Sequence, residues 1–209
     1  LQRLGVERIE LVGTPLPAEV ILTEVASTPE SLKRVCFIGR FAREKRLDSV
    51  IQAARDCPDI HFIVAGDGPL NDEVAQAAAE LANLEQHGWL SRAQVAELLD
   101  SSDLLVLPSK SERFGSIALE AMSRGRPALV SMAAGIHDWP ELRPGLFRLE
   151  PDESLSRALR TLRAKPAGYL AGVGWQARQA AWNFNVNTSA GWISMLESLK
   201  VDQFYTVKK

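Results

Sequence analysis

The stretch that decides the fold is PSKSERFGSIALEAMSRGRPAL, residues 108–129. A short apolar run, DLLVLPS, leads into it and predicts a strand, whereas the segment from Ile117 to Arg124 is helical in character. Phe114-Gly115-Ser116 marks the junction between the two elements. Glu112 therefore falls in the loop at the carboxyl end of a strand, and Glu120 falls about one turn into the helix.

This junction is a candidate ligand site. Ligands of open α/β sheets bind at the carboxyl ends of the strands. A helix start at that place offers free N–H groups and the positive end of the helix dipole to an anion. Glu112 and Glu120, with seven residues between them, would lie beside the anion. Two carboxylates beside an anion site suit a ligand that carries both phosphate and hydroxyl groups.

The remaining apolar runs predict a doubly wound α/β fold with a Rossmann-like parallel sheet and helices on both faces. Short runs without polar alternation are typical of parallel strands that are covered on both sides. They alternate with helical patterns, and such alternation implies right-handed βαβ units. The predicted strands are Val35–Ile38, Ile60–Ala65, Leu104–Leu107 and Ala128–Ser131, with weaker candidates at Glu85–Trp89 and Leu146–Leu149.

Helix patterns fill the gaps between these strands. Apolar residues at helical spacing run from Leu47 to Ala54, from Leu70 to Leu81 and from Leu155 to Leu162. Ser91-Arg92-Ala93-Gln94 predicts a capping box that opens another helix. The tail from Tyr169 to Leu199 predicts two helices with a break at Asn183–Asn187. Its part from Trp182 onward is expected to pack at one edge of the domain and leave an apolar patch.

These patterns divide the chain into three parts. Residues 1–30, which include Thr14-Pro15-Leu16-Pro17, are expected to be an interdomain linker or the end of a missing amino-terminal domain. Residues 31–168 form the predicted ligand-binding domain, and residues 169–209 its carboxyl-terminal helices. The opening LQRLGVERIELVG suggests a fragment of a longer protein.

Composition limits the classes of function. The 209 residues are 46% hydrophobic and 24% charged with a net charge of −2, which argues against a broad nucleic-acid interface. Cys36 and Cys57 give no disulfide framework and fit a reduced cytosolic chain. No apolar run approaches membrane-spanning length. The three histidines lack metal-ligand spacing, so no metal site is predicted. No Gly-x-Ser-x-Gly elbow is present, so a hydrolase triad has little support.

Two further loops lie at the same predicted edge of the sheet. The first strand ends in Gly39-Arg40, and Lys45 follows five residues after Arg40. These two cations could hold a diphosphate, with Arg as a bidentate donor and Lys as a point charge. The spacing alone favours a solvated loop, with Arg43, Glu44 and Arg46 as neighbours. Gly66 belongs to Ala65-Gly66-Asp67-Gly68-Pro69, which is not a dinucleotide fingerprint and by itself predicts a plain strand-to-helix turn.

Taken in order, three segments carry a resemblance to a known family. They are FIGRFAREKRLDSVIQAA, HFIVAGDGPL and GWLSRAQVAELLDSSDLLVLPSKSERFGSIALEAMSRGRPALVS. Together they resemble the carboxyl-terminal, donor-binding domain of family-4 retaining glycosyltransferases, which have the GT-B fold. The resemblance covers roughly residues 33–165, and the final helical segment is also similar.

The resemblance implies a role for each matching residue. Arg40 and Lys45 match the pair that grips the donor diphosphate, and Glu112 matches the glutamate near the donor sugar; these three are the predicted catalytic residues. Glu120 matches the glutamate that takes the ribose hydroxyls. The other predicted donor-binding residues are Gly39 and Gly66, Trp89 and Leu90 near the base, and Phe114, Gly115 and Ser116 at the sugar and phosphates. The family needs no tightly bound metal, so no cofactor is expected beyond the nucleotide-diphosphate sugar.

Three positions depart from the family pattern. Arg113 and Arg46 stand where glycine usually follows Glu112 and Lys45. The loop usually written Gly-Gly-x-x-Glu is Ala134-Gly135-Ile136-His137-Asp138. These changes bear on the sugar pocket more than on the diphosphate grip, and Arg113 would either meet an anionic sugar or acceptor or point to solvent.

The expected partners follow from the resemblance. They are a nucleotide-sugar donor and an amino-terminal acceptor domain of the parent chain, without which this half is expected not to turn over. The family implies a cytoplasmic site of action, and leaves open a peripheral association with the inner face of a membrane through the missing domain. Two alternatives remain open: another GT-B enzyme, such as an epimerase or phosphorylase, and a non-catalytic nucleotide-sugar binding module.

Overall fold

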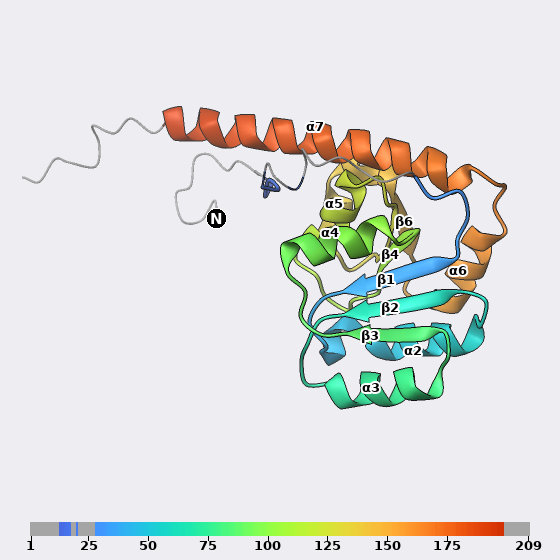
Figure 1. Ribbon diagram of the computed structural model, residues 1–209. Coiled ribbons are helices and arrows are strands. Elements are labelled where there is room, and N and C mark those ends of the chain that lie inside the picture. Colours follow the sequence, from blue (N-terminus) through green and yellow to red (C-terminus); the bar gives the residue numbers. More distant parts are fainter. Residues whose placement is uncertain (1–12, 18–19, 21–27, 199–209) are drawn as a thin grey trace, which may run out of the picture.

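Six parallel strands form one sheet in the order β3-β2-β1-β4-β5-β6 (Figure 1). The computed structural model describes residues 13–17, 20 and 28–198. The strand order reverses between β1 and β4, which are neighbours in the sheet although they are far apart in the chain. The prediction of a parallel doubly wound sheet is confirmed. The strands are β1 (Arg34–Ile38), β2 (His61–Ala65), β3 (Leu84–His87), β4 (Leu104–Leu107), β5 (Ala128–Ser131) and β6 (Leu146–Leu149).

Helices cover both faces of the sheet and enclose two hydrophobic clusters. On one face lie α2 (Leu47–Asp56), α3 (Asn71–Glu80) and α6 (Leu155–Arg163). The other face carries α4 (Arg92–Asp100), α5 (Ser116–Ser123) and most of the packed part of α7 (Tyr169–Ser198). Three short 3-10 turns complete the described part of the chain: η2 (Arg43–Lys45), η3 (Gly135–Asp138) and η4 (Pro140–Gly145).

The apolar runs of the central strands β1, β2, β4 and β5 follow from this two-sided burial. Along β1, Val35 and Phe37 belong to the cluster beneath α2 and α6, whereas Cys36 between them belongs to the cluster beneath α5 and α7. Successive side chains of a strand point to opposite faces, so a strand covered on both faces needs an apolar residue at every position. All four residues of β4 are buried for the same reason.

The predicted start of α4 is confirmed atom by atom. The Ser91 hydroxyl accepts a hydrogen bond from the Gln94 N–H at 3.4 Å, and the Gln94 side chain accepts one from the Ser91 N–H at 2.9 Å. This capping box satisfies two N–H groups that a helix start otherwise leaves without partners.

The predicted break at Asn183–Asn187 is wrong, because α7 is one helix of 30 residues. Ala181, Phe184 and Thr188 are buried at helical spacing against the domain, and this packing runs straight through the asparagines. The Asn185 side chain accepts a hydrogen bond from the Leu16 N–H at 2.6 Å, so it serves a second segment of the chain without interrupting its own helix. Asn183 and Asn187 are exposed on the outer side.

The outer side of α7 also carries large apolar side chains. Val186, Ile193 and Leu196 are 50%, 57% and 59% exposed, as expected for an apolar patch on the tail. Most of residues 1–30 lies outside the described residues, but Gly13 and Leu16 pack along α7, where the Trp192 indole N–H donates to the Gly13 carbonyl at 2.9 Å. No helix in the described ranges has the length and apolar character needed to cross a membrane. Both cysteines are buried free thiols.

Candidate functional site

The candidate site lies where the carboxyl ends of β1, β2 and β4 meet. Gly39 and Arg40 directly follow β1, and the Gly39 N–H donates to the Ala65 carbonyl at the end of β2. The Phe41 N–H donates to Asp67 at 2.8 Å, which ties the two loops together. The strand order reverses between β1 and β4 at this edge, which is the usual ligand position in such sheets.

Gly66 fixes how closely these two loops approach. Its φ is +144°, and a Cβ placed there would collide with the backbone carbonyl of Gly39. Only glycine combines this backbone conformation with so close a contact. Gly66 therefore sets the position of the Gly39-Arg40 segment and does not itself present a side chain to a ligand.

Lys45 and Glu112 form an ion pair across the site. Lys45 comes from η2 after β1, and Glu112 from the loop after β4. Their side chains keep only 20% and 19% of their surface exposed. The two loops are also joined through the backbone, because the Lys110 N–H donates to the Glu44 carbonyl at 2.7 Å. The structure thus brings two of the predicted site residues into direct contact.

Arg40 is an exposed cation at the same edge. No hydrogen bond or ion pair joins its guanidinium to another residue in the described ranges. An unpaired guanidinium keeps its five donors available for an anionic ligand.

The start of α5 carries unused backbone donors. Gly115 adopts a φ of +97° and turns the chain from the loop into the helix. Within the part of the chain that the structure describes, the N–H groups of Gly115, Ser116 and Ile117 have no hydrogen-bond partner. Three such donors at a helix start, beside Lys45 and Arg40, give the arrangement that binds phosphate groups in other proteins.

Phe114 anchors this helix start to the domain. Its ring stacks on Phe184 of α7 at 5.8 Å and meets Trp139 edge-on at 6.5 Å. The Phe114 carbonyl accepts a hydrogen bond from Ile136 in η3. The side chain is therefore used for packing, and only the adjoining backbone remains available to a ligand.

Glu120 lies on α5 one turn beyond Ser116 and faces α4. It lines a cavity of about 270 Å³ together with Arg92, Val95 and Arg124. Burial raises the pKa of the Glu120 carboxyl, and the positive charge of Arg92 opposes this shift. Arg124 pairs with Asp100, and no ion pair or hydrogen bond joins Glu120 to another described residue. A half-buried carboxylate without a partner is a candidate for ligand recognition.

Trp89 and Leu90 follow β3 at the edge of the site. Trp89 is 84% exposed, so its ring is free in this structure, whereas Leu90 is half-buried against the cluster under α4 and α5. Trp89 is not in contact with the Lys45–Glu112 pair, and its assignment to a base stays a prediction.

The departures from the family pattern have structural counterparts. Arg46 is the one non-glycine residue with a positive φ, +57°, among the described residues, and it stands where the family usually has glycine. Gly135 is retained because a Cβ there would collide with the Arg113 carbonyl. His137 is 8% exposed, its Nε2 lies 3.2 Å from the Val130 carbonyl oxygen, and its Nδ1 has no partner in the described ranges. The buried His137 ring thus packs against the end of β5.

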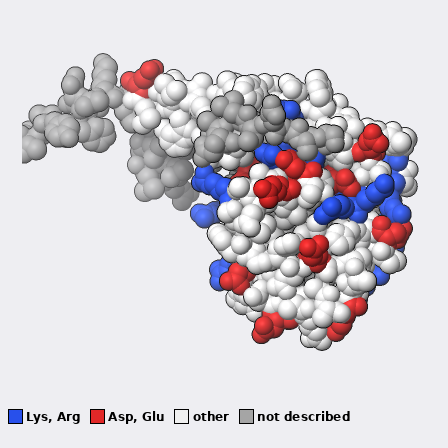
Figure 2. All heavy atoms as spheres, viewed as in Figure 1, with Lys and Arg blue, Asp and Glu red and all other residues white. Residues whose placement is uncertain are grey.

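Charges are mixed over this side of the molecule. Figure 2 shows blue and red side chains interspersed on the described surface, without one broad patch of either sign. A search of the described ranges for three or more histidine, cysteine or acidic residues placed to hold a metal ion found no such group. The cations of the site and the start of α5 are therefore the groups available to an anion.

The sequence analysis did not identify two groups that lie at the candidate site, the Arg92 side chain and the Ile117 backbone N–H. Arg92 was read only as part of a capping box, although its charge acts on Glu120. The Ile117 N–H was missed because an apolar side chain gives no sign that its backbone is unpaired. The spacing of Arg92 and Glu120 in the chain carries no signal, since only the packing of α4 on α5 brings them together.

The fold is a doubly wound α/β domain with a candidate anion site at its strand switch point. A family model described as "Glycosyl transferases group 1" matches residues 22–139, more than half of the chain. The chain belongs to this family. The match spans the strands from β1 to β5 and all the site residues above.

Curated relatives are glycosyltransferases by name. D-inositol 3-phosphate glycosyltransferase of Mycobacterium marinum is 36% identical over 153 residues, 65% of this chain and 32% of that protein. 2-Deoxystreptamine glucosyltransferase of Streptomyces kanamyceticus is 29% identical over 164 residues, 74% of this chain and 42% of that protein. The chain thus spans less than half the length of these relatives.

Solved structures share the fold. Sucrose-phosphate synthase from Thermosynechococcus elongatus superposes with a TM-score of 0.71 at 17% identity, over 90% of this chain and 53% of that one. Anabaena Alr3699/HepE in complex with UDP gives 0.67 at 22% identity, over 81% and 50%. The carboxyl-terminal domain of a group 1 glycosyl transferase (LpcC) from Francisella tularensis gives 0.58 at 21% identity, and 87% of it is covered. These likenesses establish the α/β architecture.

Proposed function

We propose that this chain is the donor-binding half of a retaining glycosyltransferase that uses a nucleotide-diphosphate sugar. One observation carries the proposal. At the switch point of the sheet, Lys45 pairs with Glu112, Arg40 is exposed directly after β1, and three backbone N–H groups at the start of α5 have no partner among the described residues, while Glu120 lies one turn further along α5. Phosphates, ribose and a sugar are the ligand parts that such a set can recognise.

Arg40 and Lys45 bind the diphosphate together with the N–H groups at the start of α5. Lys45 is paired with Glu112. Binding is then an exchange in which the diphosphate replaces Glu112 as the anion beside Lys45. The released Glu112 carboxylate becomes available to hydroxyl groups of the donor sugar.

Glu120 accepts hydrogen bonds from the ribose hydroxyls. Its carboxylate is half-buried and has no hydrogen-bond partner among the described residues, so two hydroxyl donors would compensate its loss of water. The base would lie toward Trp89, whose exposed ring is a surface on which a base can stack.

Catalysis follows from stabilising the leaving group. Arg40, Lys45 and the helix start neutralise the departing diphosphate, which is the task that a divalent cation performs in other enzymes. The sugar then develops oxocarbenium-like character as its bond to the diphosphate oxygen breaks. The acceptor hydroxyl attacks from the face that the leaving group vacates and gives its proton to the departing diphosphate, with retention at the anomeric carbon. No metal or other cofactor is needed in this scheme.

The acceptor would be held by an amino-terminal half. The relatives are two to three times as long as the aligned part of this chain, which leaves room for a second domain of similar size. Turnover, a cytoplasmic site of action and any contact with a membrane surface belong to that whole protein. This half alone is expected to bind the donor without transferring it.

Calorimetric titration of the chain with UDP-, GDP- and ADP-sugars tests the proposal. We expect one class of donor to bind, and Arg40→Ala or Lys45→Ala to weaken binding by about 1–3 kcal/mol, the size of a charge-assisted contact. The loss should be the same for every base and sugar, because both residues act on the phosphates. Arg43→Ala, which removes an exposed cation from η2, serves as the matched control.

Two results would contradict the proposal. One is a chain that binds none of the three donor classes. The other is an Arg40 or Lys45 variant that binds one donor normally and another poorly, because a phosphate contact cannot distinguish them.

A further inference from the structure

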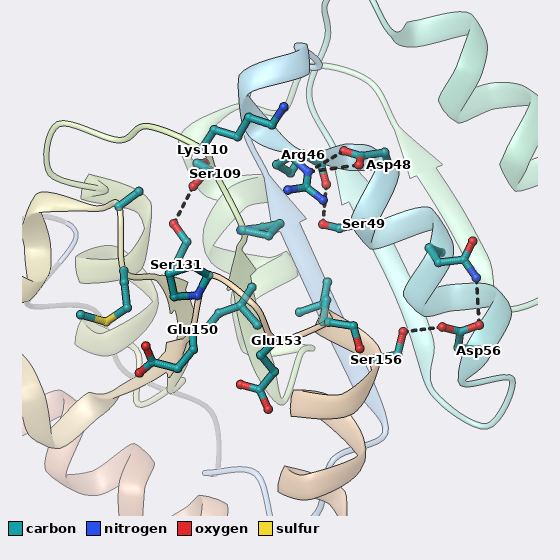
Figure 3. A pocket seen from close by; sticks show the side chains of 18 residues that line it. Arg46, Asp48, Ser49, Asp56, Ser109, Lys110, Ser131, Glu150, Glu153 and Ser156 are labelled. Carbon is teal, nitrogen blue, oxygen red and sulfur yellow. Dashed lines mark hydrogen bonds and ion pairs between the residues drawn. The ribbon is translucent and has the colours of Figure 1, made fainter.

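A second cavity, of about 600 Å³, opens on the sheet face that carries α2 and α6 (Figure 3). We call it the α2–α6 cavity. Its walls are one side of α2 from Asp48 to Asp56, the segments that follow β4 and β5, and the loop from β6 into α6. The lining residues used below are Arg46, Asp48, Asp56, Ser109, Lys110, Glu150 and Glu153.

This cavity is separate from the donor site. Arg40, Lys45, Glu112 and Glu120 do not line it. The loop after β4 stands between the two, and its Lys110 N–H is bonded to the Glu44 carbonyl of η2. A ligand in the cavity would therefore leave the diphosphate position free.

The side-chain charges on the cavity wall disfavour an anionic ligand. Four carboxylates face two cations, and one of the cations, Arg46, already donates to Asp48 at 3.1 Å. Asp56 is likewise occupied, because it accepts hydrogen bonds from Ser156 at 2.6 Å and from Gln52 at 2.9 Å. An excess of negative charge disfavours phosphate, uronate and other anionic ligands.

Three side chains on the cavity wall remain available for hydrogen bonds to a ligand: Glu150, Glu153 and Ser109. Glu150 and Glu153 extend from the loop between β6 and α6, across the cavity from α2 (Figure 3), and their carboxylates have no partner in the described ranges. Ser109 is only 1% exposed, lies on the wall at the end of β4, and its hydroxyl has no hydrogen bond within the described residues. A buried hydroxyl without a partner calls for an explanation.

Apolar surface lies between these polar groups. The wall also includes Pro108, Met132, Leu149, Pro151 and Leu155. Carboxylates that accept from hydroxyl groups, next to apolar patches that cover ring C–H groups, match the two kinds of surface on a sugar. The volume is in the range of pockets that hold organic ligands.

We propose that the α2–α6 cavity binds an uncharged saccharide through Glu150, Glu153 and Ser109. This site goes beyond the donor site, because its ligand carries no nucleotide and reaches the chain on another face of the loop after β4. Glu150 and Glu153 accept from its hydroxyl groups, and Ser109 gains the hydrogen bond that it lacks.

The test is a titration of the isotope-labelled 209-residue chain with two neutral disaccharides, maltose and cellobiose, followed by NMR. The disaccharide is expected to shift the signals of residues 149–156 and of Ser109. Glu153→Gln should weaken binding about fivefold to tenfold, because it replaces a charge-assisted hydrogen bond by a neutral one. Ser109→Ala should weaken it about threefold.

Matched controls separate this site from general effects. Glu73→Gln removes an exposed carboxylate on α3, away from the cavity, and should leave saccharide binding unchanged. A uronic-acid disaccharide should bind more weakly than its neutral counterpart. Nucleoside diphosphate should not displace the disaccharide, whatever the outcome at Arg40 and Lys45, so failure here and failure of the donor site are distinguishable.

Several outcomes overturn the proposal. They are the absence of any shift with either neutral disaccharide, displacement by nucleoside diphosphate, equal binding of the uronic-acid disaccharide, and a Glu153→Gln variant that binds as the parent chain does. Thermal unfolding of each variant shows that the comparison is made between folded proteins.

Discussion

At the scale of single residues, Arg46 is held in a conformation that favours glycine. Its φ of +57° and ψ of +43° place it in the left-handed region, between η2 and α2. A side chain there costs about 1–2 kcal/mol per residue, since the Cβ crowds the following carbonyl. The ion pair with Asp48 is exposed and offsets little of this.

We therefore expect Arg46→Gly to be more stable than Arg46→Ala by about 1 kcal/mol. Both variants lose the ion pair with Asp48, but only glycine relieves the backbone. Urea unfolding of the two variants measures the difference. Equal stability would mean that the left-handed conformation carries no strain.

Glu120 links stability to pH. Because burial raises the pKa of its carboxyl above the ordinary value of a glutamate, the folded protein binds this proton more readily than the unfolded chain does. The free energy of unfolding then falls as the pH rises between the unfolded and the folded pKa. Glu120→Gln should remove this loss. The difference in free energy of unfolding between the variant and the parent protein should therefore favour the variant more at pH 7 than below pH 4.5.

The same variant should bind nucleoside diphosphate more weakly. A 2′,3′-dideoxy nucleotide should bind the variant and the parent equally, because the hydroxyl groups that Glu120 serves are absent. Calorimetry with both ligands decides the matter. If the two ligands lose affinity by the same amount, the ribose assignment is wrong.

At the scale of elements, β1, β2, β4 and β5 were predictable because each is short, mostly apolar and largely buried. β4, β5 and β6 begin and end at the predicted residues, and β1 gains only Arg34 at its start. The weaker candidate at Glu85–Trp89 became β3, Leu84–His87, since its last residues turn away toward solvent. Burial of a whole strand leaves a clear signal in a single sequence.

The helix α7 shows a case in which the local sequence pattern was misleading, because the predicted break at Asn183–Asn187 does not occur. Asparagine lowers helix propensity by only a few tenths of a kcal/mol relative to most residues, which is less than buried aromatic packing contributes. The ring of Phe184 lies 5.0 Å from Trp139 and 5.8 Å from Phe114, both far away in the sequence. Contacts of this kind are invisible in the local pattern, and so is the meeting of Lys45 with Glu112.

The approach of the β1 and β2 loops can be tested at Gly66. We expect Gly66→Ala to destabilise the protein by roughly 2–4 kcal/mol, because the new Cβ collides with the Gly39 carbonyl in a backbone region that alanine avoids. Binding of nucleoside diphosphate should fall as well, since Gly39 leads into Arg40.

Gly88→Ala is the matched control, because a Cβ there meets no atom within 4 Å. It should change the free energy of unfolding little in the same denaturant series. Similar losses for the two variants would show that the close contact at Gly66 is unimportant.

At the scale of the whole molecule, helices cover both faces of the sheet, but no described element covers the outer side of α7. Figure 1 shows α7 lying across the domain and continuing past the sheet. Contiguous exposed apolar residues on a protein usually mark an interaction surface. Trp182, Val186 and Ile193 are 44%, 50% and 57% exposed along this helix.

We expect the chain to bind the dye ANS through this patch. A double variant, Val186→Lys with Ile193→Lys, should reduce the fluorescence strongly without changing the thermal unfolding midpoint, because both side chains are at the surface. Asn183→Lys adds charge at an exposed polar position of the same helix and should have little effect. Unchanged dye binding in the double variant would show that the patch is not a continuous apolar surface.

Because α7 is one unbroken helix, a force applied at its far end acts on its packed part. A helix of 30 residues is about 45 Å long and transmits displacement along its axis with little loss. Ile193, at the outer part, lies about 14 Å along the axis from Phe184, which rests on Phe114 directly before the start of α5. A partner bound at the far end of α7 that displaced the helix would therefore disturb the packing of Phe114, directly before the backbone donors of the candidate site.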